Sequence, residues 1–187
     1  MNLDISILEA LNTWGASNVA LTTAIANSTV YLAISLSIIA FLYSVVRNAS
    51  KPMSLFKSIK LLVSEGFIKL AIPVGIATLS AELISKLFSR ERPFVTHSNI
   101  VQVFPHAADP SMPSSHMTFT VALGIAVMFF SRKMGIAIIV LAVLSGLGRV
   151  AAGIHYPSDI IVGAVLATGV AITYKIIFKD IKRKASL

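Results

Sequence analysis

No cysteine occurs in this sequence. Its absence excludes disulfide bonds, thiolate nucleophiles and thiolate zinc sites. The histidine spacings that are typical of zinc hydrolases, His-x-His and His-Glu-x-x-His, are missing as well. We therefore expect chemistry without a metal or another cofactor, carried by histidine, arginine, serine and acidic side chains.

Charged residues are scarce. They make up 13% of the chain, whereas 56% is hydrophobic and the mean hydropathy is +0.83. Residues 10–46 contain no Asp, Glu, Lys or Arg, which leaves room for one membrane span of about 20 residues and a surface segment. This composition excludes a soluble protein and predicts one membrane-embedded domain over residues 1–187. Because the first nine residues include Asp4 and Glu9 and no cationic stretch, we expect no cleavable signal peptide.

The charges that are present are unbalanced. Sixteen Lys and Arg stand against eight Asp and Glu, which gives a net charge of +8. Much of the basic surplus gathers at residues 47–60, 132–133 and 179–184, next to apolar segments. Such clusters are typical of the cytoplasmic ends of membrane spans. We therefore interpret the charge as topology, expect no nucleic-acid partner, and place the amino terminus outside and the carboxyl terminus in the cytoplasm.

The apolar segments predict an all-α integral membrane protein. Residues 3–25 are only moderately apolar and include Trp14, which favours an amphipathic helix at the membrane interface. About five transmembrane helices should follow, at residues 29–46, 61–83, 114–131, 134–148 and 160–178. We expect them to bundle around a site at the outer face of the cell membrane, towards the periplasm or the cell exterior.

The one long polar stretch, residues 84–115, lies on the outer side in this topology. Two short apolar stretches follow it, at residues 117–131 and 134–148, each about 22 Å long as a helix. The hydrocarbon core is about 30 Å thick, so His116 and Arg149 should lie near the outer headgroups. That depth suits a lipid headgroup better than a water-soluble substrate.

The polar groups on this side have the chemistry of a phosphate site. The planar donor fork of arginine matches phosphate oxygens, and both Arg92 and Arg149 are expected at outer helix ends. Ser114 and Ser115 open the third predicted span, where a helix N-terminus favours an anion.

Histidines and a carboxylate complete the candidate site. One histidine can attack phosphorus, and a second can protonate the leaving oxygen. Asp159 follows His155 by four residues, a spacing that can fix the tautomer and orientation of the ring. Together with His116, these residues supply every part of a covalent phosphoryl-transfer site.

Each feature has a simpler explanation when it is taken alone. Arg92-Pro93 resembles an ordinary helix end at a membrane boundary, and Asp159 can simply cap a helix. Glu65 and Lys69 are spaced to neutralise each other on one helix face. The combination, in three separate segments that reach one predicted surface, favours a functional site.

Those three segments resemble the three motifs of the type 2 phosphatidic acid phosphatase superfamily. The segments are Arg92-Pro93, Pro113-Ser114-Ser115-His116 and Arg149-x5-His155-x3-Asp159. The stretch from residue 90 to residue 109 is further similar to the bacitracin-resistance undecaprenyl-diphosphatases. The chain departs from the family pattern where Ser85, rather than lysine, begins the first motif, with Lys86 one position later. It departs again at Gly148, where the family usually has serine, and at Ser115, where it often has glycine or aspartate.

The resemblance implies a metal-independent lipid phosphatase. His155 would be the nucleophile that forms a phosphohistidine, Asp159 its hydrogen-bonded partner, and His116 the general acid. The residues implied to hold the phosphoryl group are Arg92, Arg149, Ser114, Ser115 and Lys86. The implied substrate is a polyprenyl diphosphate in the bilayer, undecaprenyl diphosphate above all, and its hydrolysis would recycle the carrier for peptidoglycan synthesis and give bacitracin resistance.

Two alternatives stay open from the sequence. A phosphatase of the same superfamily that acts on phosphatidic acid or phosphatidylglycerol phosphate would have the same site chemistry. A small transporter or flippase, with Glu65, Lys69 and Glu82 as an intramembrane relay, is a rival of another class. The absence of an internal repeat argues against the transporter.

Overall fold

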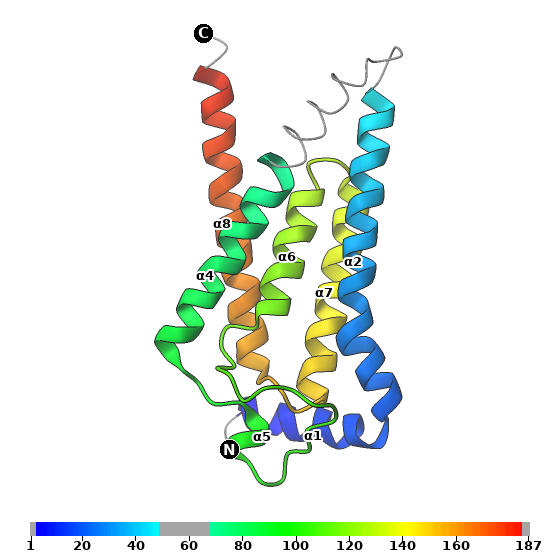
Figure 1. Cartoon of the computed structure of the whole chain (residues 1–187), viewed down its shortest axis with the longest axis vertical. Coiled ribbons are helices and arrows are strands. Elements are labelled where there is room, and N and C mark those ends of the chain that lie inside the picture. Colours follow the sequence, from blue (N-terminus) through cyan, green and yellow to red (C-terminus); the bar gives the residue numbers. More distant parts are fainter. Residues whose placement is uncertain (1–2, 49–67, 185–187) are drawn as a thin grey trace.

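The computed structural model describes residues 3–48 and 68–184, and the regular structure in these ranges is entirely helical. Its elements are α1 (Leu3–Ser17), α2 (Val19–Asn48), α4 (Ile72–Phe88), α5 (Pro93–Thr96), α6 (Ser115–Val127), α7 (Arg132–Ala151) and α8 (Pro157–Lys184). The long helices form a bundle, and α1 crosses beneath one end of it (Figure 1). This arrangement confirms the predicted all-α fold.

Within the described residues, four helical stretches are long and apolar enough to cross a membrane: Val19–Arg47, Ile68–Thr96, Arg132–Ala151 and Pro157–Phe178. Large apolar side chains are exposed along α2, α4, α7 and α8, which suits contact with lipid rather than water. The protein is therefore a multi-pass membrane protein. The remaining predicted span is α6, an apolar helix of 13 residues that is too short to qualify alone.

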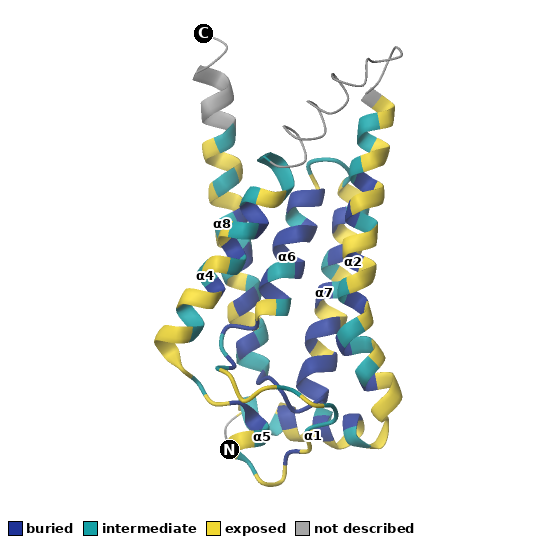
Figure 2. Cartoon of the chain, viewed as in Figure 1, coloured by how far each residue is buried: buried dark blue, intermediate teal, exposed yellow. Residues whose placement is uncertain are grey.

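Helix α6 occupies the centre of the bundle, where it contacts α2, α4, α7 and α8. Most of its residues are buried, whereas its neighbours turn exposed faces outwards (Figure 2). Its buried threonines satisfy their hydroxyls locally, because Thr118 Oγ1 donates to the Ser114 carbonyl and Thr120 Oγ1 to the His116 carbonyl. A short helix can remain at this position because protein, rather than lipid, surrounds it.

The first two helices correct the predicted boundaries. The segment expected over residues 3–25 ends at Ser17, and α2 begins at Val19, well before the expected start of the first span. Both helices pack closely on α7: a Cβ added to Gly15 would lie 2.2 Å from the Ala151 carbonyl oxygen, and one added to Gly148 would lie 2.8 Å from Ala26 N. These close approaches position α1 and the early part of α2, which hydropathy alone does not reveal.

The other boundaries move as well. Helix α7 extends from Arg132 to Ala151 and α8 begins at Pro157, so both include charged or polar residues that the apolar stretches left out. The expected loop over residues 84–115 is shorter, because α4 continues to Phe88 and α5 adds one helical turn. The first part of the second predicted span, with Glu65, lies outside the described residues. Lys69 Nζ is 6.0 Å from the centre of the Phe130 ring.

Candidate active site

The candidate residues meet at one end of the bundle. Helix α6 begins there, α7 ends there and α8 begins there, close to α1 and α5 (Figure 1). A polar pocket of about 140 Å³ lies at this end. It is lined by Arg92, His106, Asp109, Pro110, Pro113, Ser115, His116 and His155. The sequence predicted four of these lining residues as site residues: Arg92, Ser115, His116 and His155.

His155 lies in the turn between α7 and α8 and is 3% exposed. Its Nε2 atom, on the pocket side, is 3.4 Å from both Ser114 Oγ and Arg92 Nη1. Its Nδ1 atom is 3.5 Å from Asp159 Oδ2, without an aligned hydrogen bond within the described residues. A proton on Nδ1, facing the carboxylate, leaves the Nε2 lone pair free to act as a nucleophile.

Burial lowers the pKa of His155 to about 4. Asp159 opposes this shift, and the positive charges of Arg92 and Arg149 add to it. The imidazole is therefore neutral at pH 7, the state that a nucleophile requires.

Asp159 serves two purposes in the structure. Its Oδ2 atom accepts a hydrogen bond of 2.9 Å from Tyr156 N, just before α8 begins, so it caps this helix as an acidic third residue often does. The same oxygen lies beside the ring of His155. From the sequence, Asp159 could either cap a helix or contact a histidine. In the structure it does both.

Arg92 immediately precedes α5 and is buried. Its Nη1 atom donates to the Ile154 carbonyl at 2.8 Å, which fixes the guanidinium beside His155. Its Nε and Nη2 atoms donate to Asp109 Oδ1 at 3.2 and 3.0 Å. The N–H donors of an arginine side chain bind carboxylate and phosphate oxygens in a similar geometry. The two Arg92 donors that bind Asp109 could therefore also bind a phosphate.

Arg149, in the last turn of α7, is 2% exposed. Its Nη2 atom donates to His116 Nε2 at 2.9 Å. Its Nε and Nη1 atoms are buried and have no hydrogen-bond partner in the part of the chain that the structure describes. Buried, unpaired donors of a permanent cation are costly, and a bound anion would satisfy them.

The two serines of the second motif take different positions. Ser115 lines the pocket as the first residue of α6. Ser114 is the N-cap residue, but its side chain makes no capping hydrogen bond and its Oγ instead faces His155 Nε2. The structure does not bring Lys86 to the pocket, because this residue is exposed on α4 and pairs with Glu82 at 3.3 Å.

Four residues around the site were not selected from the sequence. His106 and Asp109 line the pocket. Arg90 binds the carboxylate of Asp159, and Asp4 in turn binds Arg90. Arg90 stands two residues before Arg92, and this second arginine beside the first motif was an available signal. Asp4 gave none, because only the tertiary structure brings α1 to the start of α8.

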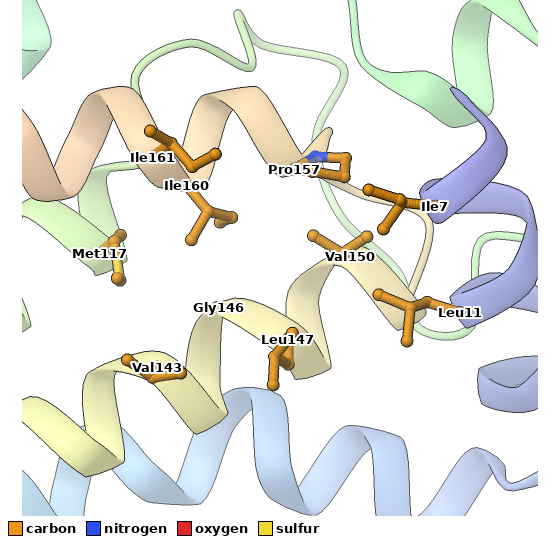
Figure 3. A pocket seen from close by; sticks show the side chains of 10 residues that line it. All are labelled: Ile7, Leu11, Met117, Val143, Gly146, Leu147, Val150, Pro157, Ile160 and Ile161. Carbon is orange, nitrogen blue, oxygen red and sulfur yellow. The ribbon is translucent and has the colours of Figure 1, made fainter. Parts of the chain in front are cut away.

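A second cavity lies close to the polar one and differs from it in chemistry. It measures about 210 Å³ and is lined by residues of α1, α6, α7 and α8, with apolar side chains and one glycine (Figure 3). The lining consists of Ile7, Leu11, Met117, Val143, Gly146, Leu147, Val150, Pro157, Ile160 and Ile161. It contains no group that can attack or bind a phosphate.

Known proteins resemble this chain in sequence and in fold. Undecaprenyl-diphosphatase BcrC of Bacillus subtilis is 40% identical over 94 residues, which are 50% of this chain and 48% of the relative. Bacitracin transport permease protein BcrC of Bacillus licheniformis is 33% identical over 91 residues, 49% of this chain and 45% of the relative. The matched region is therefore about half the length of these curated relatives.

A solved structure has the same fold. The transmembrane PAP2 type phosphatidylglycerolphosphate phosphatase of Bacillus subtilis matches with a TM-score of 0.51 and 17% identity, over 98% of this chain and 99% of that one. The family model described as PAP2 superfamily matches residues 66–183, which contain all three motifs. The resemblance that the motifs suggested is confirmed, and the chain belongs to the PAP2 superfamily.

Proposed function

We propose that this protein hydrolyses undecaprenyl diphosphate to undecaprenyl phosphate and inorganic phosphate. The observation that carries the proposal is the position of His155 Nε2 beside the buried Arg92 in one polar pocket at the end of a membrane bundle, with the buried Arg149 hydrogen-bonded to His116 of the same pocket. The substrate is supported by the similarity to the undecaprenyl-diphosphatase of Bacillus subtilis. Hydrolysis would return the lipid carrier to cell-envelope glycan synthesis and give bacitracin tolerance.

His155 is the nucleophile in this proposal. Its Nε2 atom attacks the terminal phosphorus, and a P–N bond forms while the bond from phosphorus to the bridging oxygen breaks. Undecaprenyl phosphate leaves. A water molecule then attacks the phosphohistidine, which releases inorganic phosphate and restores the neutral ring. The position of Asp159 beside Nδ1 supports this role, because a carboxylate stabilises the imidazolium character that develops on attack.

Arg92, Arg149, Ser114 and Ser115 hold the transferred phosphoryl group. Two observations support this assignment. The Nε and Nη1 atoms of Arg149 have no hydrogen-bond partner within the described residues, and the Nε and Nη2 atoms of Arg92 bind the carboxylate of Asp109, whose oxygens resemble those of a phosphate. Arginine forks at the equatorial oxygens stabilise the charge of the transition state. Lys86 is not part of this set, because it pairs with Glu82 on α4.

His116 is the general acid. In the structure its Nε2 atom accepts a hydrogen bond from Arg149, so this nitrogen carries no proton in that arrangement. A bound phosphate draws the Arg149 donors to its own oxygens, which frees His116 Nε2 to take up a proton. Protonated His116 then donates to the leaving oxygen.

The proposal places this pocket on the outer side of the cell membrane. Arg47, Arg132 and Lys133 belong to the other end of the bundle, where α2 ends and α7 begins, and basic clusters favour the cytoplasm. The chain has no cysteine, so single cysteines at Ser98 and Lys133, both exposed, can be labelled one at a time in intact cells. Labelling of position 133 alone from outside would reverse the proposed orientation.

The decisive experiment is phosphate release by the purified protein. Undecaprenyl diphosphate, phosphatidic acid and phosphatidylglycerol phosphate are compared, each with and without EDTA. We expect the highest kcat/KM for undecaprenyl diphosphate and no loss in EDTA, because His155 itself attacks phosphorus. Preference for either other lipid would assign the chain to another branch of the superfamily.

A transporter is the second candidate, because one relative is named a transport permease. Proteoliposomes distinguish the two functions. Phosphate release without movement of labelled lipid or bacitracin across the bilayer supports the phosphatase. Movement without phosphate release supports the transporter.

A further inference from the structure

We propose that Asp4 and Arg90 are positioning residues that hold Asp159 against His155, so that the interfacial helix α1 supports the active geometry. The inference rests on the proposed role of His155 as the nucleophile. It concerns two residues outside the three motifs, and one of them, Asp4, lies on α1, which the family model does not cover.

The Asp159 carboxylate is fully buried and is held from two sides. Its Oδ1 atom accepts a hydrogen bond of 2.7 Å from Arg90 Nη1. Its Oδ2 atom accepts from Tyr156 N and lies 3.5 Å from His155 Nδ1. Because Arg90 binds one oxygen, the other keeps its direction towards the histidine ring. Arg90 therefore fixes the rotation of the carboxylate on which the orientation of His155 depends.

Arg90 is itself held by three groups. Its Nη2 atom donates to Asp4 Oδ2 at 2.9 Å, and its Nη1 atom also donates to Ser158 Oγ at 2.7 Å. Its guanidinium carbon lies 3.7 Å from the centre of the Tyr156 ring, a cation–π distance. A free arginine side chain has many rotamers, and these contacts select one of them.

Asp4 connects this arrangement to the start of α8. Its Oδ1 atom accepts from Ser158 N at 2.9 Å, and its Oδ2 atom accepts from Ser158 Oγ at 2.6 Å. The same carboxylate thus contacts the residue before Asp159 and the arginine that binds Asp159. A change at Asp4 reaches the His155 ring through both routes.

Helix α1 does not depend on Asp4 for its place. Asn12 Nδ2 donates to the Val101 and Ala151 carbonyls at 2.8 and 3.0 Å, and Asn12 Oδ1 accepts from Val101 N at 2.8 Å. Gly15 packs directly on Ala151. These contacts lie towards the other end of α1, so a substitution at Asp4 removes the polar link while the helix stays docked.

A double-mutant cycle in the full-length purified protein tests the inference. Asp4→Asn should lower kcat about tenfold and Arg90→Gln about 10²-fold, with little change in KM, because misplacement of a reacting group slows the chemical step. In the Asp159→Asn background, Asp4→Asn should cause no further loss, because its route to His155 is already broken. Asp4→Glu, which keeps the charge, should recover part of the rate. The matched control is Glu9→Gln, which removes an exposed charge from the same helix and should leave kcat unchanged.

The inference is overturned if Asp4→Asn keeps the wild-type kcat, or if it lowers kcat by the same factor with and without Asp159. A second readout needs no turnover and covers variants that lose activity for other reasons. Nitrogen-15 spectra of histidine-labelled protein report the His155 tautomer, which should shift from Nδ1–H towards Nε2–H in Arg90→Gln. An unchanged tautomer in a folded Arg90→Gln protein also overturns it. If the wild type hydrolyses none of the three lipids, the proposed function fails, whereas the tautomer spectra still decide the positioning role.

Discussion

The two cavities at the motif end of the bundle are close neighbours with opposite chemistry. His116, Arg149 and Asp159 belong to the polar site, whereas the next residue along each helix lines the apolar cavity. Those next residues are Met117, Val150 and Ile160. One step along a helix turns a side chain by about 100°, so each of α6, α7 and α8 directs a polar side chain towards the histidines of the polar site and the next, apolar side chain towards the other cavity.

The difference teaches that volume does not identify the reacting site. The apolar cavity is larger, about 210 Å³ against about 140 Å³, yet of the two only the smaller pocket is lined by histidines and an arginine. Substitutions on the polar side should therefore reduce the rate of the chemical step. Substitutions of the next residues along the helices, Met117, Val150 and Ile160, should lower folding stability and leave kcat almost unchanged.

The largest effect is expected from His155→Ala. Removing the covalent acceptor should lower kcat by about 10⁴-fold or more and eliminate the acid-labile phosphoenzyme. Mass spectrometry of the trapped intermediate checks this prediction. Phosphate on Ser114 or Ser115, or near-normal turnover of His155→Ala, would show that the assigned nucleophile is wrong.

His116→Ala and Met117→Ala form a matched pair on adjacent positions of α6. Loss of the general acid should lower kcat by about 10²–10⁴-fold, and least for a nitrophenyl phosphate whose leaving group needs no proton. Met117→Ala should lower the thermal unfolding midpoint and keep kcat close to the wild-type value. If the two variants lose turnover equally, the division between the two cavities does not hold.

Arg149→Lys should lower kcat/KM by about 10²–10³-fold, because a point charge cannot reproduce the donor fork at phosphate oxygens. Val150→Ala is the neighbouring control. It shortens a buried side chain and should act mainly on stability. Steady-state kinetics on the lipid diphosphate measure both variants, and equal rates for Arg149→Lys and the wild type would contradict the phosphate-binding role.

The pH dependence of kcat/KM should reflect the lowered pKa of His155, about 4. The folded protein keeps most of this ring neutral as the pH falls from 7 to 5, whereas the neutral fraction of a ring with the usual pKa of about 6.5 would fall about 25-fold. Between pH 6.5 and 4, His155 binds a proton in the unfolded chain but stays neutral in the folded protein. Its contribution to the free energy of unfolding is therefore complete above pH 6.5 and declines as the pH falls from 6.5 to 4. An acid limb of kcat/KM near pH 6.5 would contradict the buried, neutral nucleophile.

The smallest effect concerns Asp109. Asp109→Asn removes the charge that competes for Arg92, so inorganic phosphate should inhibit about two- to fivefold more strongly, the range expected for an exposed ion pair. Product-inhibition kinetics measure this change. Weaker inhibition would mean that Asp109 assists phosphate binding instead of opposing it.

Much of the site could be predicted from the sequence, because its groups are uncommon in an apolar chain. His116, His155, Asp159, Arg92 and Arg149 stand out as polar residues beside apolar spans, and the fold brings them together. The roles of these residues stay predictions until the variants are measured. The bundle itself could be predicted from hydropathy, since membrane spans leave a strong compositional signal.

The rest depended on tertiary contacts. Lys86 was selected because it lies one position from the place of the motif lysine. On α4, however, its side chain pairs with Glu82. Asp4 carried no local signal, since the arginine that it contacts, Arg90, is 86 positions away. Asp109 ends the stretch that resembles known phosphatases, but only the structure shows that it binds Arg92. The close glycine contacts between helices, at Gly15 and Gly148, were not predictable either, since no window of hydropathy contains them.

The hydrogen bond between Asp4 and Ser158 joins residues that are 154 positions apart. During synthesis α1 emerges before the other described helices, whereas its partner on α8 follows 154 positions later. Contacts of such long range form late, since the chain must first lose the entropy of a large closed loop. The geometry around His155 is therefore assembled only after α8 has inserted. A chain that stops before α8 would contain most of the polar residues but not their arrangement around His155, so the proposed phosphatase activity would require α8 to be in place.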